Sequence, residues 1–424
     1  MENTFGVQLR NDWVHNGLFR TENRVRTDKY DINACNDEPY GSGGPIECLS
    51  STTLNPVGAV LPSDTDLSKF TDTIGSVYVE NKIQWASKFR SVVALRGDDA
   101  KYVVTNLNPT YVSNIPSLSS TPVNFAQANS GSASKFLPQP KASLIFGPWA
   151  KTEFYAQGGF SFHSNDARGA TQTMQPISPD NPFPTSCAKI TPLVQTKGGE
   201  IGVRISVVPH LQSTVALWYL RSNSELMQDG DTGGTSASEQ SSNRYGLEWA
   251  NYYTPTEHLA IDFDIADSRA QFTQIDPDDA AQSVVKAALS VNGTPYGTVN
   301  WQESGQGGKL VPEAVKVVIS SGATLHDLKG FTSSLRLRYF GPRPLTSDGL
   351  YQSNQTVLLN GELGYQFNKK WHFTTELLNM LNRKDADIDY AYVYQIAPTA
   401  APAFGRVNHP TEPLLVRFAL GRSF

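Results

Sequence analysis

Alternation of apolar and polar residues at every second position recurs along almost the whole chain. The last segment, 411–424, shows it most clearly, because Leu414, Val416, Phe418 and Leu420 fall on one side of an extended chain. The residues between them are mostly small or charged. A period of two is that of a β-strand with one face in an apolar environment. The pattern therefore predicts a protein built largely from strands.

About fifteen segments carry this period, and the connections between them are alternately short and long. They are 3–11, 18–26, 74–85, 89–105, 137–146, 152–162, 200–208, 212–221, 244–253, 259–265, 312–320, 332–340, 356–367, 371–381 and 411–424. A soluble β protein of 424 residues usually divides into domains of about 100–150 residues. No linker interrupts this series. We therefore expect residues 1–424 to form a single β domain.

The polar faces of several strands carry charge, which separates two kinds of β protein. The charged residues are Arg204, Asp262, Asp264, Arg336, Arg338, Glu362 and Arg417. In a transmembrane barrel such residues line a wet lumen while the apolar face meets lipid. Aromatic residues near strand ends fit interfacial girdles; they are Trp85, Phe89, Trp149, Tyr155, Trp249, Tyr253, Tyr339, Phe367 and Trp371. We therefore expect an all-β, antiparallel transmembrane β-barrel with short periplasmic turns and long extracellular loops.

The composition agrees with a membrane barrel. Charged residues make up 18% of the chain, below the share of about 25% typical of soluble domains. A net charge of -5 without a basic cluster argues against a nucleic-acid partner. No apolar run is long enough for a transmembrane helix. The first residues, MENTFGVQLRND, contain no basic segment followed by an apolar one, so no secretory signal is expected there.

Two local features interrupt the strand pattern. Residues 12–17 predict a short turn between the first two strands. The segment 277–291 could form a short helix, with Asp276 as the N-cap and Pro277 as the first helical residue. The acids Asp278 and Asp279 lack the spacing of a calcium loop, so they fit the start of a capped helix better.

The redox state of the cysteines has two possible interpretations. Cys35 and Cys48 lie close together in a polar stretch rich in Gly and Pro, and a disulfide between them would clip one surface loop in an oxidising compartment. The alternative is two free thiols in a reducing cell. Cys187 has no evident partner.

No motif for catalysis, nucleotide binding or zinc binding appears, so we expect no enzyme activity, metal or cofactor. The weak ligand-binding candidates are His163, Asn165, Asp166 and Arg168 at the outer end of one strand, and Arg336 and Arg338 on a charged face. Each could contact a ligand in the mouth of the lumen or attract an anion. We favour the alternative, in which each belongs to a structural network, since clustered charges often do.

Several stretches resemble the barrel of a TonB-dependent outer-membrane receptor. They are Tyr78–Trp85, Asn129–Gly131 with Pro140–Lys141, Gly158–Gly169, Leu335–Pro344, Glu376–Asn382 and the terminal Phe424. The resemblance implies a 22-stranded barrel with an amino-terminal plug. It implies import of a scarce ligand such as a ferric siderophore, haem, cobalamin or a sugar, with energy supplied through TonB. It also implies that Phe418 and Phe424 form a signal for the barrel-assembly machinery.

The resemblance leads to further expectations about this chain. It lacks the plug and the TonB box, so we expect about fifteen strands from the carboxy-terminal part of the barrel. Because the first connection is expected to be short, the first and last strands should both run inward from outside, which would make closure between them parallel. The expected partners are outer-membrane lipid, the assembly machinery, a small ligand and, in the full-length protein, the TonB complex. The expected location is the cell outer membrane.

Three other functions compete with the importer. A passive porin or channel would share the barrel but would have no plug. An outer-membrane enzyme such as a lipase would need a serine and a histidine paired at membrane depth, and no compelling pair is found. A soluble β-rich binding protein would be recovered without detergent.

Overall fold

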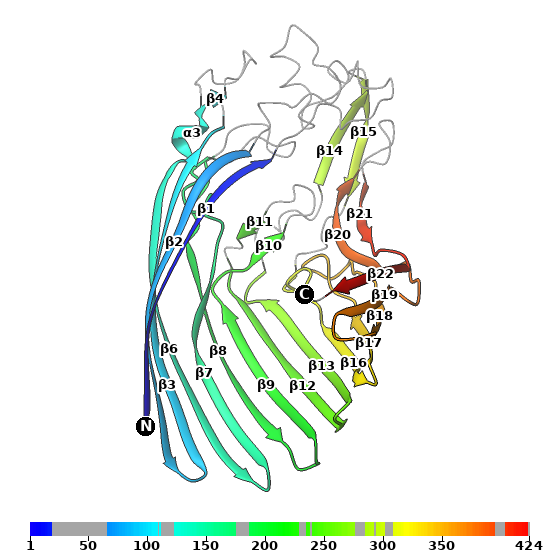
Figure 1. The fold of residues 1–424 in the computed structure, drawn as a ribbon. Coiled ribbons are helices and arrows are strands. Elements are labelled where there is room, and N and C mark those ends of the chain that lie inside the picture. Colours follow the sequence, from blue (N-terminus) through cyan, green and yellow to red (C-terminus); the bar gives the residue numbers. More distant parts are fainter. Residues whose placement is uncertain are drawn as a thin grey trace.

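A large antiparallel sheet dominates the computed structural model. The model describes residues 1–18, 66–108, 110–111, 123–174, 186–228, 235–237, 240–275, 285–291, 294–301, 308–394 and 403–422. The sheet has 14 strands in the order β1-β2-β3-β6-β7-β8-β9-β12-β13-β16-β17-β18-β19-β22 (Figure 1). Every neighbouring pair is antiparallel. The prediction of an antiparallel barrel wall is confirmed, with 14 strands in place of about fifteen.

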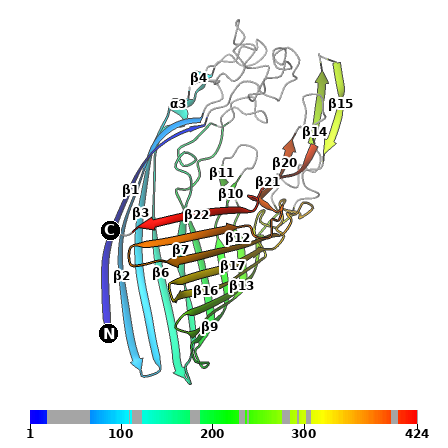
Figure 2. The ribbon, with the colours of Figure 1, turned by 45° about the vertical axis from the view of Figure 1, so that its right-hand side comes forward.

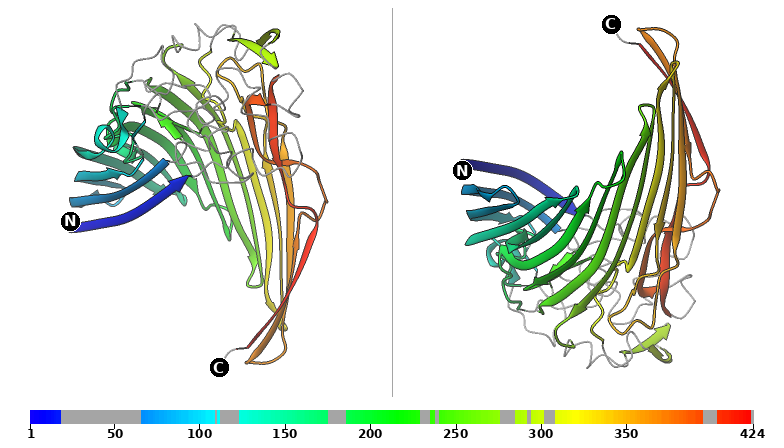
Figure 3. Two further views of the ribbon diagram at one scale, coloured as in Figure 1. Left: turned by 90° about the horizontal axis from the view of Figure 1, so that it is seen from above. Right: turned by 90° about the horizontal axis from the view of Figure 1, so that it is seen from below.

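The strands of the large sheet are longest near the amino terminus. Their bounds are β1 Glu2–Leu18, β2 Asp66–Ala86, β3 Phe89–Asn106, β6 Gly131–Trp149, β7 Thr152–Ser164, β8 Leu193–Ile205, β9 Leu211–Ser222, β12 Ser242–Thr256, β13 Leu259–Phe272, β16 Val317–Leu328, β17 Phe331–Phe340, β18 Thr356–Gln366, β19 Trp371–Leu378 and β22 Leu415–Arg422. The sheet curves strongly but is not closed, and β1 and β22 lie at its two edges (Figure 3).

Short hairpins and a single turn of helix lie among the long connections. The hairpins pair β4 (Thr110–Tyr111) with β5 (Val123–Asn124), β10 (Leu226–Gln228) with β11 (Thr235–Ala237), β14 (Val285–Val291) with β15 (Thr294–Trp301), and β20 (Ala386–Tyr394) with β21 (Ala403–Pro410). The helix is α3, Phe125–Ala128, whose N-cap Asn124 accepts a hydrogen bond from the Gln127 N–H. Among the described residues, no helix is long and apolar enough to cross a membrane.

The connections alternate in length as predicted. Tight turns join β2 to β3, β6 to β7, β8 to β9, β12 to β13, β16 to β17 and β18 to β19 at one end of the sheet (Figures 1 and 2). All other connections in the large sheet are longer, and the strands that they join leave off and resume at the opposite end. We call these the turn end and the loop end.

The first strand corrects two predictions. Residues 12–17 do not turn, because they continue β1 and pair with β2, Asp12 with Asp72 and Gly17 with Leu67. The connection from β1 to β2 is therefore a long one at the loop end. It follows that β1 runs toward the loop end and β22 runs away from it, so the two edge strands are antiparallel to each other. The expected parallel closure was wrong.

Three other predicted elements differ from those in the structure. The proposed helix over 277–291 is wrong for residues 285–291, which form β14, and Asp276 and Pro277 lie outside the described residues. The strand expected over 312–320 begins later, at Val317, and continues to Leu328. The final long connection was predicted as a loop, but it contains the β20–β21 hairpin.

The two faces of the sheet differ in chemistry. Ladder neighbours such as Ile201, Leu217 and Leu247 share the outer face, where Leu217 keeps 51% of its side chain exposed. The opposite face carries Asp98, Asp262 and Arg336, and most of the buried residues of the strands lie there. Side chains converge on the concave side of a curved sheet, so we call this the inner face. An apolar outer face and a charged inner face are what a barrel in lipid requires.

Most of the expected girdle aromatics lie on the outer face. Trp85, Trp149, Phe367 and Trp371 are exposed near the turn end, and Trp249 is exposed in the middle of β12. Lys88 lies over the Trp149 ring and Arg422 over the Trp371 ring, at 5.8 and 5.3 Å from the ring centroids. Tyr155 is an exception, because its side chain is buried on the inner face and its hydroxyl donates to Glu200. Its assignment to a girdle was wrong.

The outer face generates a test of lipid exposure. We expect Leu247→Lys to lower the free energy of unfolding by about 2–4 kcal/mol, the cost of a cation on the lipid face near mid-depth. The neighbouring inner-face variant Glu248→Lys should change it by less than about 1 kcal/mol, since that position faces a polar lumen. Urea unfolding of the protein folded in lipid vesicles measures both. Equal losses for the two variants would contradict the assignment of faces.

Candidate functional site

The inner face of β2, β3 and β6 is held by a buried polar cluster around Asp98. The Asp98 side chain is fully buried and accepts hydrogen bonds from Arg96 Nε at 3.0 Å, Ser76 Oγ at 2.6 Å and the Gln139 amide. Arg96 also donates to Gln8 on β1 at 3.1 Å. A buried carboxylate is tolerated when its oxygens are satisfied in this way. The cluster ties four strands together and is structural.

A second inner network crosses β3, β7 and β8. Glu153 accepts from Arg90 Nη2 at 2.9 Å and lies 3.9 Å from Arg204 Nη1. The Arg204 guanidinium also lies over the Tyr155 ring, 4.4 Å from its centroid. The charges that the sequence places on the inner face are thus largely paired with one another.

The two arginines on β17 differ in whether an acid pairs with them. Arg336 makes a two-pronged contact with Asp262 on β13, at 3.2 and 3.0 Å. The bridge passes over Gly322 of β16, where a Cβ would lie 2.6 Å from Asp262 Oδ1. Arg338 is exposed, and no described residue forms a hydrogen bond or ion pair with its guanidinium. Of the two, only Arg338 can offer its full charge to a ligand.

The candidates after β7 form a turn that folds against the sheet. Asp166 accepts from Arg168 Nε at 3.0 Å and from the Arg168 N–H at 2.9 Å. The Ala167 and Ala170 side chains that follow are buried against Tyr102 and its neighbours. Burial raises the pKa of the Asp166 carboxyl, but the hydrogen bonds and charge of Arg168 outweigh it, and the pKa lies below its ordinary value. Asp166 and Arg168 therefore shape the loop.

His163 and Asn165 are less satisfied than their neighbours. Asn165 donates to the Thr191 carbonyl at 2.8 Å, yet its Oδ1 is buried without a hydrogen-bond partner. His163 Nε2 is buried and unpartnered as well. Buried polar atoms without partners are uncommon. These two side chains stay ligand-contact candidates.

A charged cluster at the loop end was missed by the sequence reasoning. Asp389 on β20 is fully buried, and Arg406 Nε on β21 lies 3.8 Å from its Oδ1. Burial raises the pKa of the Asp389 carboxyl, against the opposing charges of Arg343 and Arg406. Arg343 and Asn354 come from the connection after β17. Arg406 Nη1 donates to Asn354 Oδ1 at 2.9 Å, so this contact joins the connection to the β20–β21 hairpin. The partners are too far apart in sequence for a local pattern to indicate it.

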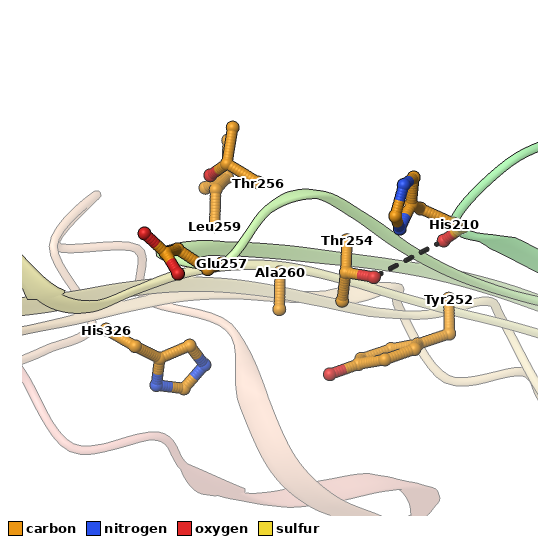
Figure 4. Close-up of a pocket in the computed structure, with 8 residues that line it drawn as sticks. All are labelled: His210, Tyr252, Thr254, Thr256, Glu257, Leu259, Ala260 and His326. Carbon is orange, nitrogen blue, oxygen red and sulfur yellow. Dashed lines mark hydrogen bonds between the residues drawn. The ribbon is translucent and has the colours of Figure 1, made fainter.

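A pocket of about 380 Å³ lies at the turn end of the sheet (Figure 4). It is lined by His210, Tyr252, Thr254, Thr256, Glu257, Leu259, Ala260 and His326. The Thr254 hydroxyl donates to the His210 carbonyl at 3.4 Å. In the described part of the chain, no three His, Cys, Asp or Glu side chains converge to hold a metal ion. The lining combines imidazole, hydroxyl and carboxylate groups with the apolar side chains of Leu259 and Ala260.

Four further residues were singled out in the sequence analysis. Cys35, Cys48 and Phe424 lie outside the described residues. Phe418 is on the outer face of β22, 70% exposed, with its ring stacked on Phe373 at 6.1 Å.

Comparisons with known proteins agree with this architecture. A family model described as "TonB dependent receptor-like, beta-barrel" matches residues 2–382. The chain is similar to the siderophore receptor PiuA from Acinetobacter baumannii, with 14% identity and a TM-score of 0.61, over 99% of this chain and 53% of that one. It is also similar to the closed form of the ferric-catecholate import receptor Fiu from E. coli K12, with 15% identity and a TM-score of 0.59, over 99% and 52%.

A third solved structure, the ferric yersiniabactin uptake receptor FyuA from Yersinia pestis, shares 12% identity and a TM-score of 0.57, over 85% of this chain and 47% of that one. The chain thus spans about half the length of the structures that it matches. At these identities the likeness shows the fold alone. No curated protein matched the chain.

The Asp166–Arg168 pair predicts a pH-dependent loop. A lowered carboxyl pKa gives stability that is present above the ordinary value of about 3.9 and is lost as pH falls through the lowered value. We therefore expect Arg168→Gln to raise hydrogen exchange of residues 165–174 about tenfold at pH 7. Wild type should reach the same level only in strong acid, after correction for intrinsic rates. Lys189→Gln is the control, and equal exchange in both variants would refute the role of the pair.

Proposed function

The chain belongs to the TonB-dependent receptor-like β-barrel family, and from this premise we propose that it forms the carboxy-terminal part of the barrel of an outer-membrane importer. The cargo that we propose is a scarce ligand such as a ferric siderophore. The observation that carries the proposal is a sheet of 14 antiparallel strands with a charged inner face and an apolar outer face. That arrangement encloses a polar path through lipid.

The siderophore class rests on the solved structures that share the fold. Those reported above are described as receptors for siderophores, ferric catecholates or ferric yersiniabactin. Nothing in these comparisons favours the passive porin considered from the sequence.

The edges of the sheet support the partial-barrel part of the proposal. Among the described strands, β1 and β22 each pair with one neighbour. An unpaired strand edge is costly in lipid. We infer that additional strands of the whole receptor join these edges. Their number is even, because β1 and β22 run in opposite directions. In a barrel of 22 strands, β1 would then be strand 9.

The partners follow from the same proposal. In the whole receptor, a plug fills the lumen and a TonB-contacting segment couples it to the inner membrane. Phe418 of β22 and the terminal Phe424 serve as the signal for the barrel-assembly machinery. Outer-membrane lipid covers the outer face. His163, Asn165 and Arg338 are the ligand-contact candidates, since the structure leaves polar atoms of each without described partners.

Uptake of labelled ferric siderophores by cells that express the whole receptor tests the function. We expect accumulation of at least one ferric siderophore, and we expect it to stop when the TonB complex is inactivated. Cells that lack the receptor provide the baseline. Uptake that continues without TonB would instead identify a passive channel.

The two arginines of β17 allow a sharper test of ligand contact. Arg338→Gln should weaken binding of an anionic ferric siderophore about five- to tenfold, because it removes an available cation from the inner face. Arg336→Gln should leave that affinity nearly unchanged and lower thermal stability, since Arg336 is engaged by Asp262. Equilibrium binding and thermal unfolding of the purified receptor separate the two effects. An equal affinity loss in both variants would contradict the assignment.

A further inference from the structure

Two cations face each other on the outer face of the sheet. Lys197 of β8 and Arg221 of β9 are partners in the strand ladder. Both fall on the side that carries Ile201 and Leu217, so both point away from the lumen. The only contact recorded for the Arg221 guanidinium in the described chain is a 3.4 Å hydrogen bond to Ser241 Oγ. No described carboxylate pairs with either cation.

Such a pair is unfavourable by itself. Side chains directly opposite each other in an antiparallel ladder have Cβ atoms about 4.5–5.5 Å apart, and like charges at these positions destabilise the sheet. The repulsion grows where the surroundings are less polar than water. An anion placed between the two cations would turn repulsion into two attractions.

Another cation on the outer face, Arg269, does have an acid beside it. Arg269 of β13 is the ladder partner of Tyr245, and its Nη1 lies 2.6 Å from Asp267 Oδ1. Lys197 and Arg221 have no such acid beside them. The outer face therefore holds cations with and without a neighbouring acid, and Lys197 and Arg221 are two without one that face each other.

Polar and aromatic groups complete the site. Asn243 is the ladder partner of Arg221, and its Oδ1 accepts a 2.7 Å hydrogen bond from the Tyr219 hydroxyl. This orientation leaves the Asn243 amide N–H groups as donors beside the guanidinium. Tyr219 and Tyr245 are ladder partners one row nearer the turn end, and both are exposed. Exposed tyrosines above an apolar band mark the level of lipid headgroups.

Space for a headgroup is present beside these residues. Gly199 is the ladder partner of both Tyr219 and Gly158, so no side chain stands on the outer face at either glycine. The site thus has two cations, amide and hydroxyl donors, an aromatic edge and an open surface at headgroup depth. These features match a phosphate that is attached to a membrane lipid.

We propose that Lys197 and Arg221 bind the phosphate of an anionic lipid in the leaflet at the loop end of the barrel. Ser241 and Asn243 assist as neutral polar neighbours. The proposal rests on the lipid-facing orientation of the sheet and is independent of the ligand that the receptor imports. A negative result in the lipid test would not change the expected effect of Arg338→Gln on siderophore binding. A negative result in the uptake test would not change the expected binding of lipid at Lys197 and Arg221.

Thermal unfolding in two lipid compositions tests the site. In nanodiscs of phosphatidylcholine alone, Lys197→Gln should raise the unfolding midpoint, because it removes a repulsion. In nanodiscs that also contain phosphatidic acid, the same variant should lower the midpoint relative to wild type. A variant that shifts the midpoint in the same direction in both compositions would overturn the proposal.

Native mass spectrometry of bound phosphatidic acid gives a second readout that does not depend on stability. The affinity should fall about tenfold in Lys197→Gln and in Arg221→Gln, and Arg221→Lys should retain most of it. Lys101→Gln is the matched control, since Lys101 is an outer-face cation whose ladder partner is Thr73. Equal loss in the control would overturn the site. If free inorganic phosphate raised the unfolding midpoint of wild type as much as phosphatidic acid does, the assignment of the site to a lipid would be overturned.

Discussion

The pairing of every backbone N–H and C=O group is the constraint on which the rest of this structure depends. Hydrocarbon supplies no water to satisfy those groups, so a strand in lipid must have neighbours on both sides. The ladder from β1 to β22 meets this requirement for every strand except the two at its edges. Since neighbouring strands are antiparallel, the connections fall at two ends, and side chains sort onto two faces. The polar clusters of the inner face are a consequence of that sorting.

The sequence predicts the strands well where the two faces meet different environments. The segment 212–221 corresponds to β9, Leu211–Ser222, and 332–340 corresponds to β17, Phe331–Phe340. The signal disappears where a strand continues beyond the apolar band, because both faces are then polar. Residues 12–17 of β1 were predicted as a turn, although their partners at 67–72 complete the ladder.

The site was less predictable than the fold because its contacts depend on register. Asp166 and Arg168 are close in sequence, and a turn-shaping role could be weighed for them from the start. Arg336 and Asp262 are 74 positions apart, and their contact also needs the glycine at position 322. Lys197 and Arg221 look like ordinary surface cations until the ladder places them face to face. Alternation indicates which face a charge occupies, whereas only the register indicates its neighbour.

The two sides of the loop end are built differently. On one side the long strands β2 and β3 stay hydrogen-bonded to the main sheet through their outer halves. On the other, β20 and β21 form a separate two-stranded sheet that is attached to the rest by hydrogen bonds such as Arg406 Nη1 to Asn354 Oδ1 at 2.9 Å and Thr356 Oγ1 to the Ala386 carbonyl at 2.7 Å. Opening the first rim requires breaking the barrel ladder, whereas the hairpin can open as its own cooperative unit. One rim of the loop end is therefore part of the barrel sheet, and the other is a separate two-stranded unit.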